Sequence, residues 1–220
     1  MGGVALRREE ILGVILAGGQ SRRFGQDKAV ASLGQRSLIE HVLARAMPQV
    51  GAMAISGRDY GLGVPVIADM MPGEGPLGGI LSSLAWAREK GFGAIASFAC
   101  DAPFFPADLV AQLTIPIHLG ATSSYARSLS GRHPVFAIWP VGVTAELAAL
   151  YEAGLRALKA AQDQLSGVPV AFPEGSAPGG DMFFNINRQV DQAMACHWLE
   201  AGDPFRMRAP SQRRGGPCNQ

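Results

Sequence analysis

Residues 11–28 read ILGVILAGGQSRRFGQDK, an apolar run of strand length that passes directly into a loop rich in glycine and in cationic side chains. The run from Ile11 to Ala17 predicts a buried β-strand. Gly18 and Gly19 then allow a sharp turn and a close approach of the backbone to a ligand, because neither carries a Cβ atom. Open α/β sheets bind ligands at the carboxyl ends of their parallel strands, so this stretch predicts such a sheet and a binding loop at its edge.

Apolar runs of strand length alternate with helical patterns along the rest of the chain. We expect strands at 11–17, 51–56, 64–68, 93–99, 134–139 and 168–172. We expect helices at 37–47, with Ser37 as the N-cap, at 77–90, from about 106 onward, within 142–164 and at 188–200. This order predicts an α/β fold with a mainly parallel central sheet that helices cover on both faces.

Length, charge and cysteine content exclude several classes of protein. The 220 residues suffice for one domain with an ordinary core, and a net charge of +1 provides no basic field for nucleic acid. Cys100, Cys196 and Cys218 are widely spaced and form no CxxC pair, which argues against a zinc site and against a disulfide framework. We therefore expect no nucleic-acid partner and a reducing, cytoplasmic location.

The sequence also predicts how the chain is divided. We expect an N-terminal extension at 1–10, a single domain at 11–200 and a tail at 201–220. The tail is rich in Arg, Pro and Gly and lacks apolar periodicity, which predicts disorder. A signal-peptide pattern and an apolar span of about 20 residues are both missing, so we expect no membrane association.

The cations of the opening loop point to an anionic ligand. Arg22, Arg23 and Lys28 can neutralise a polyphosphate that successive backbone N–H groups also contact. The two standard phosphate motifs nevertheless fail. GxGxxG would need glycines where Gln20 and Arg23 stand, and GxxxxGK[ST] fails because five residues separate Gly19 from Gly25 and the lysine comes later. Neither a nicotinamide dehydrogenase nor a P-loop NTPase is supported, and a plain turn with solvated arginines stays open as the alternative.

A carboxylate follows the predicted strand 93–99 directly. Asp101 stands where a central strand would end beside the phosphate-binding loop, and Mg²⁺ prefers hard oxygen ligands together with substrate phosphates. We therefore predict that Asp101 is a metal ligand, although it could instead cap the helix that starts near Pro106. No set of residues resembles a Ser/His/Asp or Cys/His nucleophile site, which favours positioning and charge neutralisation over covalent catalysis.

The opening loop resembles a known signature. LAGGQSRRFGQDK is similar, position for position, to the LAGGxSxRMGxDK signature of molybdenum cofactor guanylyltransferases, within the wider family of MobA-like nucleotidyltransferases; Phe24 replaces the methionine. Five further segments resemble family motifs and stand in the family's order. They are VIAD (66–69), GPLGG (75–79), CDAPF (100–104), RHP (132–134) and FNIN (184–187). The family's threonine and proline after FNIN are replaced by Arg188 and Gln189, so the helix there would need Asn187 as its cap.

The resemblance implies a fold and an activity. The fold would be one three-layer α/β/α domain of the Rossmann-like nucleotidyltransferase type. The activity would be Mg²⁺-dependent transfer of GMP from GTP to molybdopterin, with release of pyrophosphate, and apo-molybdoenzymes or other cofactor-assembly proteins are further candidate partners. Cytidylyl transfer to the same pterin and a non-catalytic GTP or cofactor carrier remain the alternatives. Guanylyl members of the family carry LAGG and cytidylyl members LAAG, so Gly18 favours GTP.

Residue chemistry and resemblance together assign the candidate site residues. Nucleotide binding is expected of Leu16, Ala17, Gly18, Gly19, Lys28, Asp69, Gly78 and Asp101, with Pro76 and Gly79 lining the same pocket. Catalysis is expected of Arg23, Lys28 and Asp101, metal binding of Asp101 and Asn187, and contact with the second substrate of Arg132, His133 and Asn185. Asp27 is expected to orient Lys28 or close the loop. Three residues have simpler alternatives: Asp69 could close a turn, His133 could be a satisfied loop histidine, and Asn187 could be only a cap.

Overall fold

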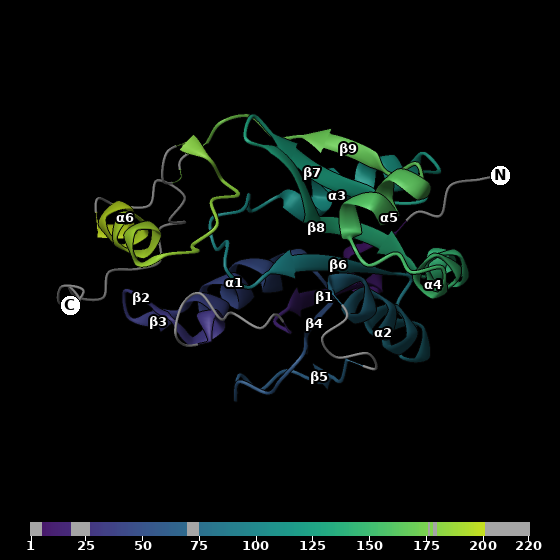
Figure 1. Cartoon of the computed structure of the whole chain (residues 1–220), viewed down its shortest axis with the longest axis horizontal. Coiled ribbons are helices and arrows are strands. Elements are labelled where there is room, and N and C mark those ends of the chain that lie inside the picture. Colours follow the sequence, from purple (N-terminus) through teal and green to yellow (C-terminus); the bar gives the residue numbers. More distant parts are fainter. Residues whose placement is uncertain (1–5, 19–26, 70–74, 176, 178–179, 201–220) are drawn as a thin grey trace.

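A seven-stranded sheet forms the centre of the protein, whose computed structural model describes residues 6–18, 27–69, 75–175, 177 and 180–200 (Figure 1). In spatial order the strands are β5 (Val66–Ile67), β4 (Ala52–Ser56), β1 (Ile11–Leu16), β6 (Ala94–Ala99), β8 (Gly131–Pro140), β7 (Ser124–Ser128) and β9 (Val168–Ala171). β8 runs antiparallel to both of its neighbours, and the other strands are mutually parallel. The prediction of a mainly parallel sheet is confirmed.

Helices cover both faces of this sheet. α1 (Leu38–Ala46) and α3 (Leu109–His118) pack on one face, and α2 (Pro76–Glu89), α4 (Thr144–Glu152) and α5 (Leu158–Gln164) pack on the other. The side chains of β1 alternate between these two layers, because Ile11 and Ile15 join the first core and Leu12 and Val14 the second. Burial on both faces explains why β1 reads as a continuous apolar run.

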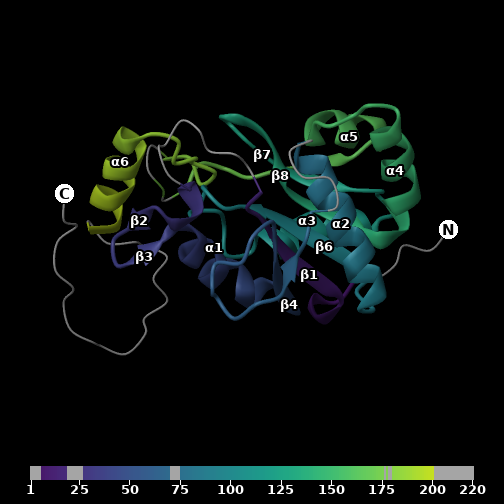
Figure 2. The ribbon, with the colours of Figure 1, turned by 60° about the horizontal axis from the view of Figure 1, so that its bottom comes forward.

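A smaller unit stands at one end of the sheet. α6 (Gln189–Glu200) lies beside the hairpin of β2 (Ser32–Leu33) and β3 (Arg36–Ser37), as both views show (Figure 2). The side-chain amide of Gln192 donates to the carbonyl of Ser32 and joins the two elements. α1 begins directly after β3, and Glu40 accepts hydrogen bonds from both the backbone and the hydroxyl of Ser37, which confirms Ser37 as its N-cap.

The predicted elements differ from the observed ones in the second half of the chain. β7 was not expected, β8 begins at Gly131 instead of 134, and the helical pattern in 142–164 divides into α4 and α5 at Gly154. Gly154 has φ +95°, which the left-handed turn between the two helices requires. In the first half, β5 is shorter than the predicted strand, and α3 begins three residues after Pro106.

The structure describes part of the predicted N-terminal extension and none of the predicted C-terminal tail. Leu6, placed in the predicted extension, is only 7% exposed and belongs to the core, and a 3₁₀-helix at Arg8–Glu10 leads into β1. The predicted tail 201–220 lies outside the described residues. In the described part of the chain, every helix is too short or too polar to cross a membrane.

Candidate active site

The end of β1 and the end of β4 meet at the carboxyl edge of the sheet. The N–H of Ala17 donates to the carbonyl of Ser56 at 2.9 Å, and the N–H of Gly57 donates to that of Ile67 at 3.1 Å. Gly57 has φ +130°, and a Cβ atom there would lie 3.1 Å from the backbone of Ala17 and Gly18. Glycine is therefore required at position 57, because it lets the start of the predicted binding loop lie against β4.

The N-terminus of α2 approaches the same edge of the sheet. A Cβ atom on Gly79 would lie 2.9 Å from Ser56 Oγ and 3.6 Å from a methyl group of Leu16, so this glycine allows the helix to pack closely on β1 and β4. Gly78 is buried beside it, and Pro76 occupies the first helical position. The segment predicted to line the nucleotide pocket thus lies next to the end of β1.

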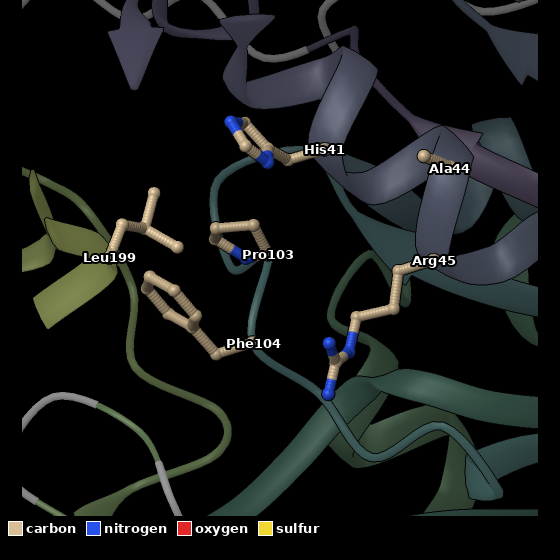
Figure 3. Close-up of a pocket in the computed structure, with 6 residues that line it drawn as sticks. All are labelled: His41, Ala44, Arg45, Pro103, Phe104 and Leu199. Carbon is tan, nitrogen blue, oxygen red and sulfur yellow. The ribbon is translucent and has the colours of Figure 1, made fainter. Parts of the chain in front are cut away.

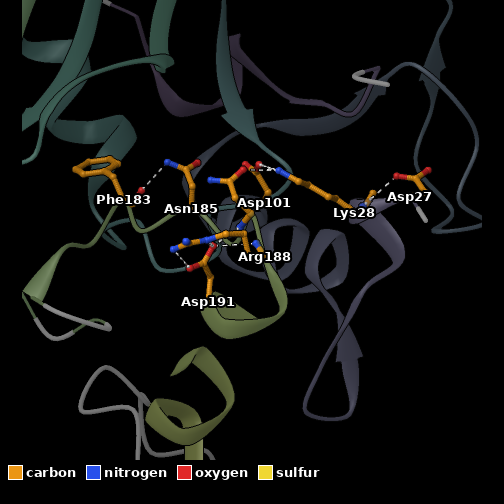
Figure 4. Close-up of polar contacts among 9 residues, drawn as sticks. Asp27, Lys28, Asp101, Phe183, Asn185, Arg188 and Asp191 are labelled. Atoms are coloured by element: carbon orange, nitrogen blue, oxygen red, sulfur yellow. Dashed lines mark hydrogen bonds and ion pairs between the residues drawn. The ribbon is translucent and has the colours of Figure 1, made fainter. Parts of the chain in front are cut away.

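Lys28 brings three distant segments together (Figure 4). It opens a 3₁₀-helix, Lys28–Val30, that is capped by Asp27, whose Oδ1 accepts from the N–H of Ala29 at 3.1 Å. The ammonium group of Lys28 donates to Asp101 Oδ2 at 3.2 Å and to Asn187 Oδ1. These contacts span 73 and 159 residues of sequence. Lys28, Asp101 and Asn187, which the sequence predicted for catalysis and metal binding, form one cluster.

The segment before α6 is attached to Asp101 through its backbone. The N–H of Ile186, a fully buried residue, donates to the carbonyl of Asp101 at 2.8 Å. Asp191 then accepts from the N–H groups of Asn187 and Arg188 at 3.0 and 2.8 Å. Asp191 thus holds the two residues that precede α6, as the acidic residue of a capping box does, and the described contacts show no cap from the Asn187 side chain. Asn187 keeps its side-chain oxygen for Lys28.

The electrostatic setting of Asp191 stabilises this arrangement. Burial by itself would raise the pKa of its carboxyl, but hydrogen bonds from the Arg188 side chain and from the Asn187 and Arg188 backbones lower it below the ordinary value. The carboxylate is therefore charged at neutral pH and can hold the helix start in place.

The oxygen atoms of the cluster are suited to a hard cation. Asp101 Oδ2 and Asn187 Oδ1 converge on the charged nitrogen of Lys28, so both already face positive charge. A carboxylate and an amide oxygen are ligands that Mg²⁺ accepts when phosphates and water complete its coordination. The described residues contain no group of three or more His, Cys, Asp or Glu that could hold a metal unaided. A carboxylate and an amide oxygen would leave the remaining coordination positions of such a metal to phosphate and water.

Arg132 and His133 point to opposite faces of β8. Arg132 donates to Asp163 on α5 at 2.7 Å and lies over the ring of Tyr125 at 4.6 Å. His133 stacks on Phe183 with ring centroids 4.3 Å apart, and its Nε2 lies 2.7 Å from Ser128 Oγ. Burial lowers the pKa of His133, which favours a neutral ring at pH 7.

Of the residues predicted to contact the second substrate, two therefore meet at Phe183. Asn185 donates to the backbone carbonyl of Phe183 at 3.2 Å, and His133 stacks on the ring of the same residue. Asn185 lies between Phe183 and Asp101 in Figure 4. Asp69 follows β5 and is half-buried. Gly19 and Arg23, predicted to bind the nucleotide phosphates, lie outside the described residues.

Two side chains near the cluster were not singled out by the sequence. Tyr60 donates from its hydroxyl toward Asp27 Oδ2 at 3.0 Å and the carbonyl of Ala17 at 3.2 Å, and Arg58 pairs with Asp27 at 3.3 Å. They stand in the segment GRDYGLG, whose only signal was an aromatic residue among glycines.

Cys100 lies beside the cluster without reactive chemistry. Burial first, and then the charges of Asp101 and Asp27, raise the pKa of the Cys100 thiol to about 12. A thiol with this pKa is protonated at neutral pH and is a poor nucleophile, so the site has no sign of covalent catalysis by this residue.

A hollow of about 220 Å³ lies beside Pro103 and Phe104, which follow Asp101 in the sequence (Figure 3). It is lined by His41, Ala44, Arg45, Pro103, Phe104 and Leu199. Its polar side chains already have protein partners, since His41 Nε2 lies 2.7 Å from the carbonyl of Leu33 and Arg45 donates to that of Phe105. None of the clustered groups above lines it.

Comparison with solved structures identifies the fold. Molybdopterin-guanine dinucleotide biosynthesis protein A from Archaeoglobus fulgidus is similar with a TM-score of 0.68 at 24% identity, covering 86% of this chain and 99% of that one. The 2-C-methyl-D-erythritol 4-phosphate cytidylyltransferase from Thermus thermophilus has a TM-score of 0.59 at 15% identity, covering 85% and 98%. The Rossmann-like nucleotidyltransferase fold expected from the sequence is thereby confirmed.

Comparison of sequences identifies the family. Residues 13–165 match the family described as the MobA-like NTP transferase domain. A molybdenum cofactor guanylyltransferase of Rhizobium leguminosarum bv. trifolii (strain WSM2304) is 40% identical over 202 residues, covering 90% of this chain and 97% of the relative. One of Rhodobacter capsulatus is 41% identical over 207 residues, covering 91% and 99%. The chain therefore belongs to the MobA-like NTP transferase family, together with the molybdenum cofactor guanylyltransferases that it matches over nearly their whole length.

Proposed function

We propose that this chain transfers GMP from GTP to molybdopterin, forming the guanine dinucleotide form of the molybdenum cofactor and releasing pyrophosphate. The observation that carries the proposal is the cluster of Lys28, Asp101 and Asn187 at the carboxyl edge of the sheet. It stands in a chain that is 40% identical to a molybdenum cofactor guanylyltransferase over 90% of its length. A cation and two oxygen ligands beside a strand-end loop provide what transfer between phosphates needs.

The nucleotide would lie against the end of β1. The backbone of Leu16, Ala17 and Gly18 approaches the ligand without an obstructing Cβ atom at Gly18, where the space is open. Lys28, together with the predicted Arg23 and the backbone of Gly19, would neutralise the phosphates. The start of α2 at Gly78 and the carboxylate of Asp69 would complete the nucleotide pocket.

The transfer itself requires no nucleophile from the protein. A phosphate oxygen of molybdopterin forms the new bond to the α-phosphorus of GTP, and the bond from that phosphorus to the bridging oxygen breaks, which releases pyrophosphate. Lys28 would stabilise the negative charge that grows on the leaving group. Asp101 and Asn187 would hold Mg²⁺, which supplies further neutralisation of phosphate charge. Cys100, whose raised pKa keeps the thiol protonated at neutral pH, takes no part.

The second substrate would lie beside Phe183. His133 and Asn185 both contact this residue, and a neutral imidazole and an amide offer hydrogen bonds to a pterin. Arg132 would not contact the pterin itself, since its guanidinium is paired with Asp163. It would instead anchor the start of β8 to α5. Handover of the product to apo-molybdoenzymes or to other cofactor-assembly proteins would follow in the cytoplasm.

The test is a pyrophosphate-release assay with molybdopterin, Mg²⁺ and each of GTP, CTP and ATP. Release with GTP alone supports the proposal. Release with CTP would identify a cytidylyltransferase. Tight GTP binding without release under any condition would identify a carrier. Omission of Mg²⁺ should abolish release if Asp101 and Asn187 hold the metal.

A further inference from the structure

Tyr60 joins the two described ends of the glycine-rich loop. It belongs to the segment that follows β4, and its ring packs against the larger core cluster while its hydroxyl reaches out of it. The oxygen lies 3.2 Å from the carbonyl of Ala17, at the end of β1, and 3.0 Å from Oδ2 of Asp27, at the start of the 3₁₀-helix that carries Lys28. We propose that Tyr60 is a positioning residue for the transfer and acts on Lys28 through Asp27.

The chemistry of these contacts makes Tyr60 a donor and nothing else. A carbonyl and a carboxylate only accept, so the single phenolic proton is shared between Ala17 and Asp27. Burial first, and then the hydrogen bond and charge of Asp27, raise the pKa of Tyr60 well above its ordinary value. The phenol therefore keeps its proton at neutral pH, which argues against a role as a base.

Asp27 transmits this contact to Lys28. Its Oδ1 caps the 3₁₀-helix by accepting from Ala29, a residue that is only 1% exposed, so the carboxylate and the helix start are held as one unit. Its Oδ2 faces Tyr60 and Arg58. Lys28 is the next residue along the chain and extends its ammonium group to Asp101. The position of the Asp27 carboxylate thus determines where the backbone of Lys28 lies and therefore from where its side chain extends.

Tyr60 and Arg58 contact the same oxygen in different surroundings. The Arg58 side chain is 69% exposed, and its ion pair with Asp27 at 3.3 Å is open to solvent, so it contributes little. The Tyr60 hydroxyl is part-buried, and a hydrogen bond to a charged group in such a place is stronger. Removal of the Tyr60 hydroxyl therefore releases Asp27 from β1, whereas removal of the Arg58 charge does not.

The experiment compares Tyr60→Phe with Arg58→Gln as the matched control. Tyr60→Phe keeps the ring and removes only the hydroxyl, and we expect it to lower kcat/KM for GTP about tenfold. Arg58→Gln should stay within twofold of the unmodified chain. Thermal unfolding of both variants establishes that they are folded at the assay temperature. A role in stability alone predicts a lower Tm for Tyr60→Phe with unchanged kcat/KM, and this result would overturn the inference.

A double-mutant cycle tests whether Tyr60 acts on the reaction through Lys28. This inference rests on the proposed role of Lys28, so Lys28→Met must itself be slow. In the Lys28→Met background, Tyr60→Phe should then change kcat/KM by less than twofold, because the group on which it acts is gone. A further tenfold loss in that background contradicts the inference while leaving the proposed role of Lys28 intact. An unimpaired Lys28→Met variant overturns both.

The same set of variants can be compared by their affinity for GTP. Isothermal titration with GTP should show a Kd about tenfold higher for Tyr60→Phe than for the unmodified chain, and no further rise when Tyr60→Phe is added to Lys28→Met. This measurement separates the inference from the proposed activity, because it applies even to a chain that binds GTP without releasing pyrophosphate. Equal Kd values for Tyr60→Phe and the unmodified chain would refute the positioning role.

Discussion

Replacement of Asp191 by alanine should loosen the segment that carries Asn187. The carboxylate is 7% exposed and accepts the backbone N–H groups of Asn187 and Arg188 at 3.0 and 2.8 Å. Each lost bond of this kind costs about 1 kcal/mol, so we expect a loss of about 2 kcal/mol in the free energy of unfolding. In a domain of this size that corresponds to a fall in Tm of about 4–8 °C. The variant should also release pyrophosphate several times more slowly, because Asn187 no longer has a fixed place beside Lys28.

Thermal unfolding at two pH values separates this contribution from general destabilisation. The pKa of Asp191 is lowered in the folded state, so its stabilising effect is fully present above the ordinary value of 3.8 and is lost as pH falls below it through the folded value. The gap in Tm between the unmodified chain and Asp191→Ala should therefore be full at pH 7 and narrow toward pH 3.

Asp108→Ala is the control, since Asp108 stands at the start of α3 without a side-chain bond to the helix backbone. We expect it to change the free energy of unfolding by less than about 0.5 kcal/mol. A fall in Tm below 1 °C for Asp191→Ala, or equal falls for the two variants, would refute the reasoning about the start of α6.

Three further predictions concern the cluster and its supports. Asp101→Ala should lower kcat by orders of magnitude while the Tm changes by only a few degrees, and a near-normal rate of pyrophosphate release would contradict the metal assignment. Gly79→Ala should lower the free energy of unfolding, measured in urea, by about 1–3 kcal/mol, because the new Cβ would lie 2.9 Å from Ser56 Oγ. Adding Ser56→Ala to this variant should restore part of the lost stability. No restoration would exclude this clash as the cause. Cys100, with its pKa raised to about 12, should react slowly with iodoacetamide at pH 8 in the folded chain and faster after unfolding, as peptide mass spectrometry can show. Rapid labelling of the folded chain would contradict the raised pKa.

The first half of the fold was predictable from the sequence because its strands are apolar. β1 and β6 are buried on both faces and are mainly apolar, with Ser97 as the one polar residue of β6. β7 escaped prediction because Ser123 and Ser124 are completely buried polar residues at its start, and the Ser124 hydroxyl donates to the carbonyl of Leu113 on α3. A strand that begins with buried serines leaves no hydropathy signal, and here only the Ser124 hydroxyl has its partner on α3.

The candidate site was predictable where it follows strand ends. Lys28 and Asp101 both come after buried runs, which places them at one edge of a parallel sheet. The orientation of Arg132 and His133 was not predictable, because the strand was expected to begin at 134, and residues outside a strand carry no alternation. β8 begins at Gly131, so the two adjacent side chains necessarily point to opposite faces.

Joining Lys28 to a residue 159 positions away has a consequence for biosynthesis. A ribosome makes the chain from its N-terminus, and β9, the last strand of the sheet, ends at Ala171, before Asn187 exists. A nascent chain could thus complete its sheet while Asn187, one of the two proposed metal ligands, is still missing from the cluster. Ribosome-bound or prematurely terminated chains would then fold without the complete cluster, and full ligand affinity would appear only in chains that extend beyond Asn187.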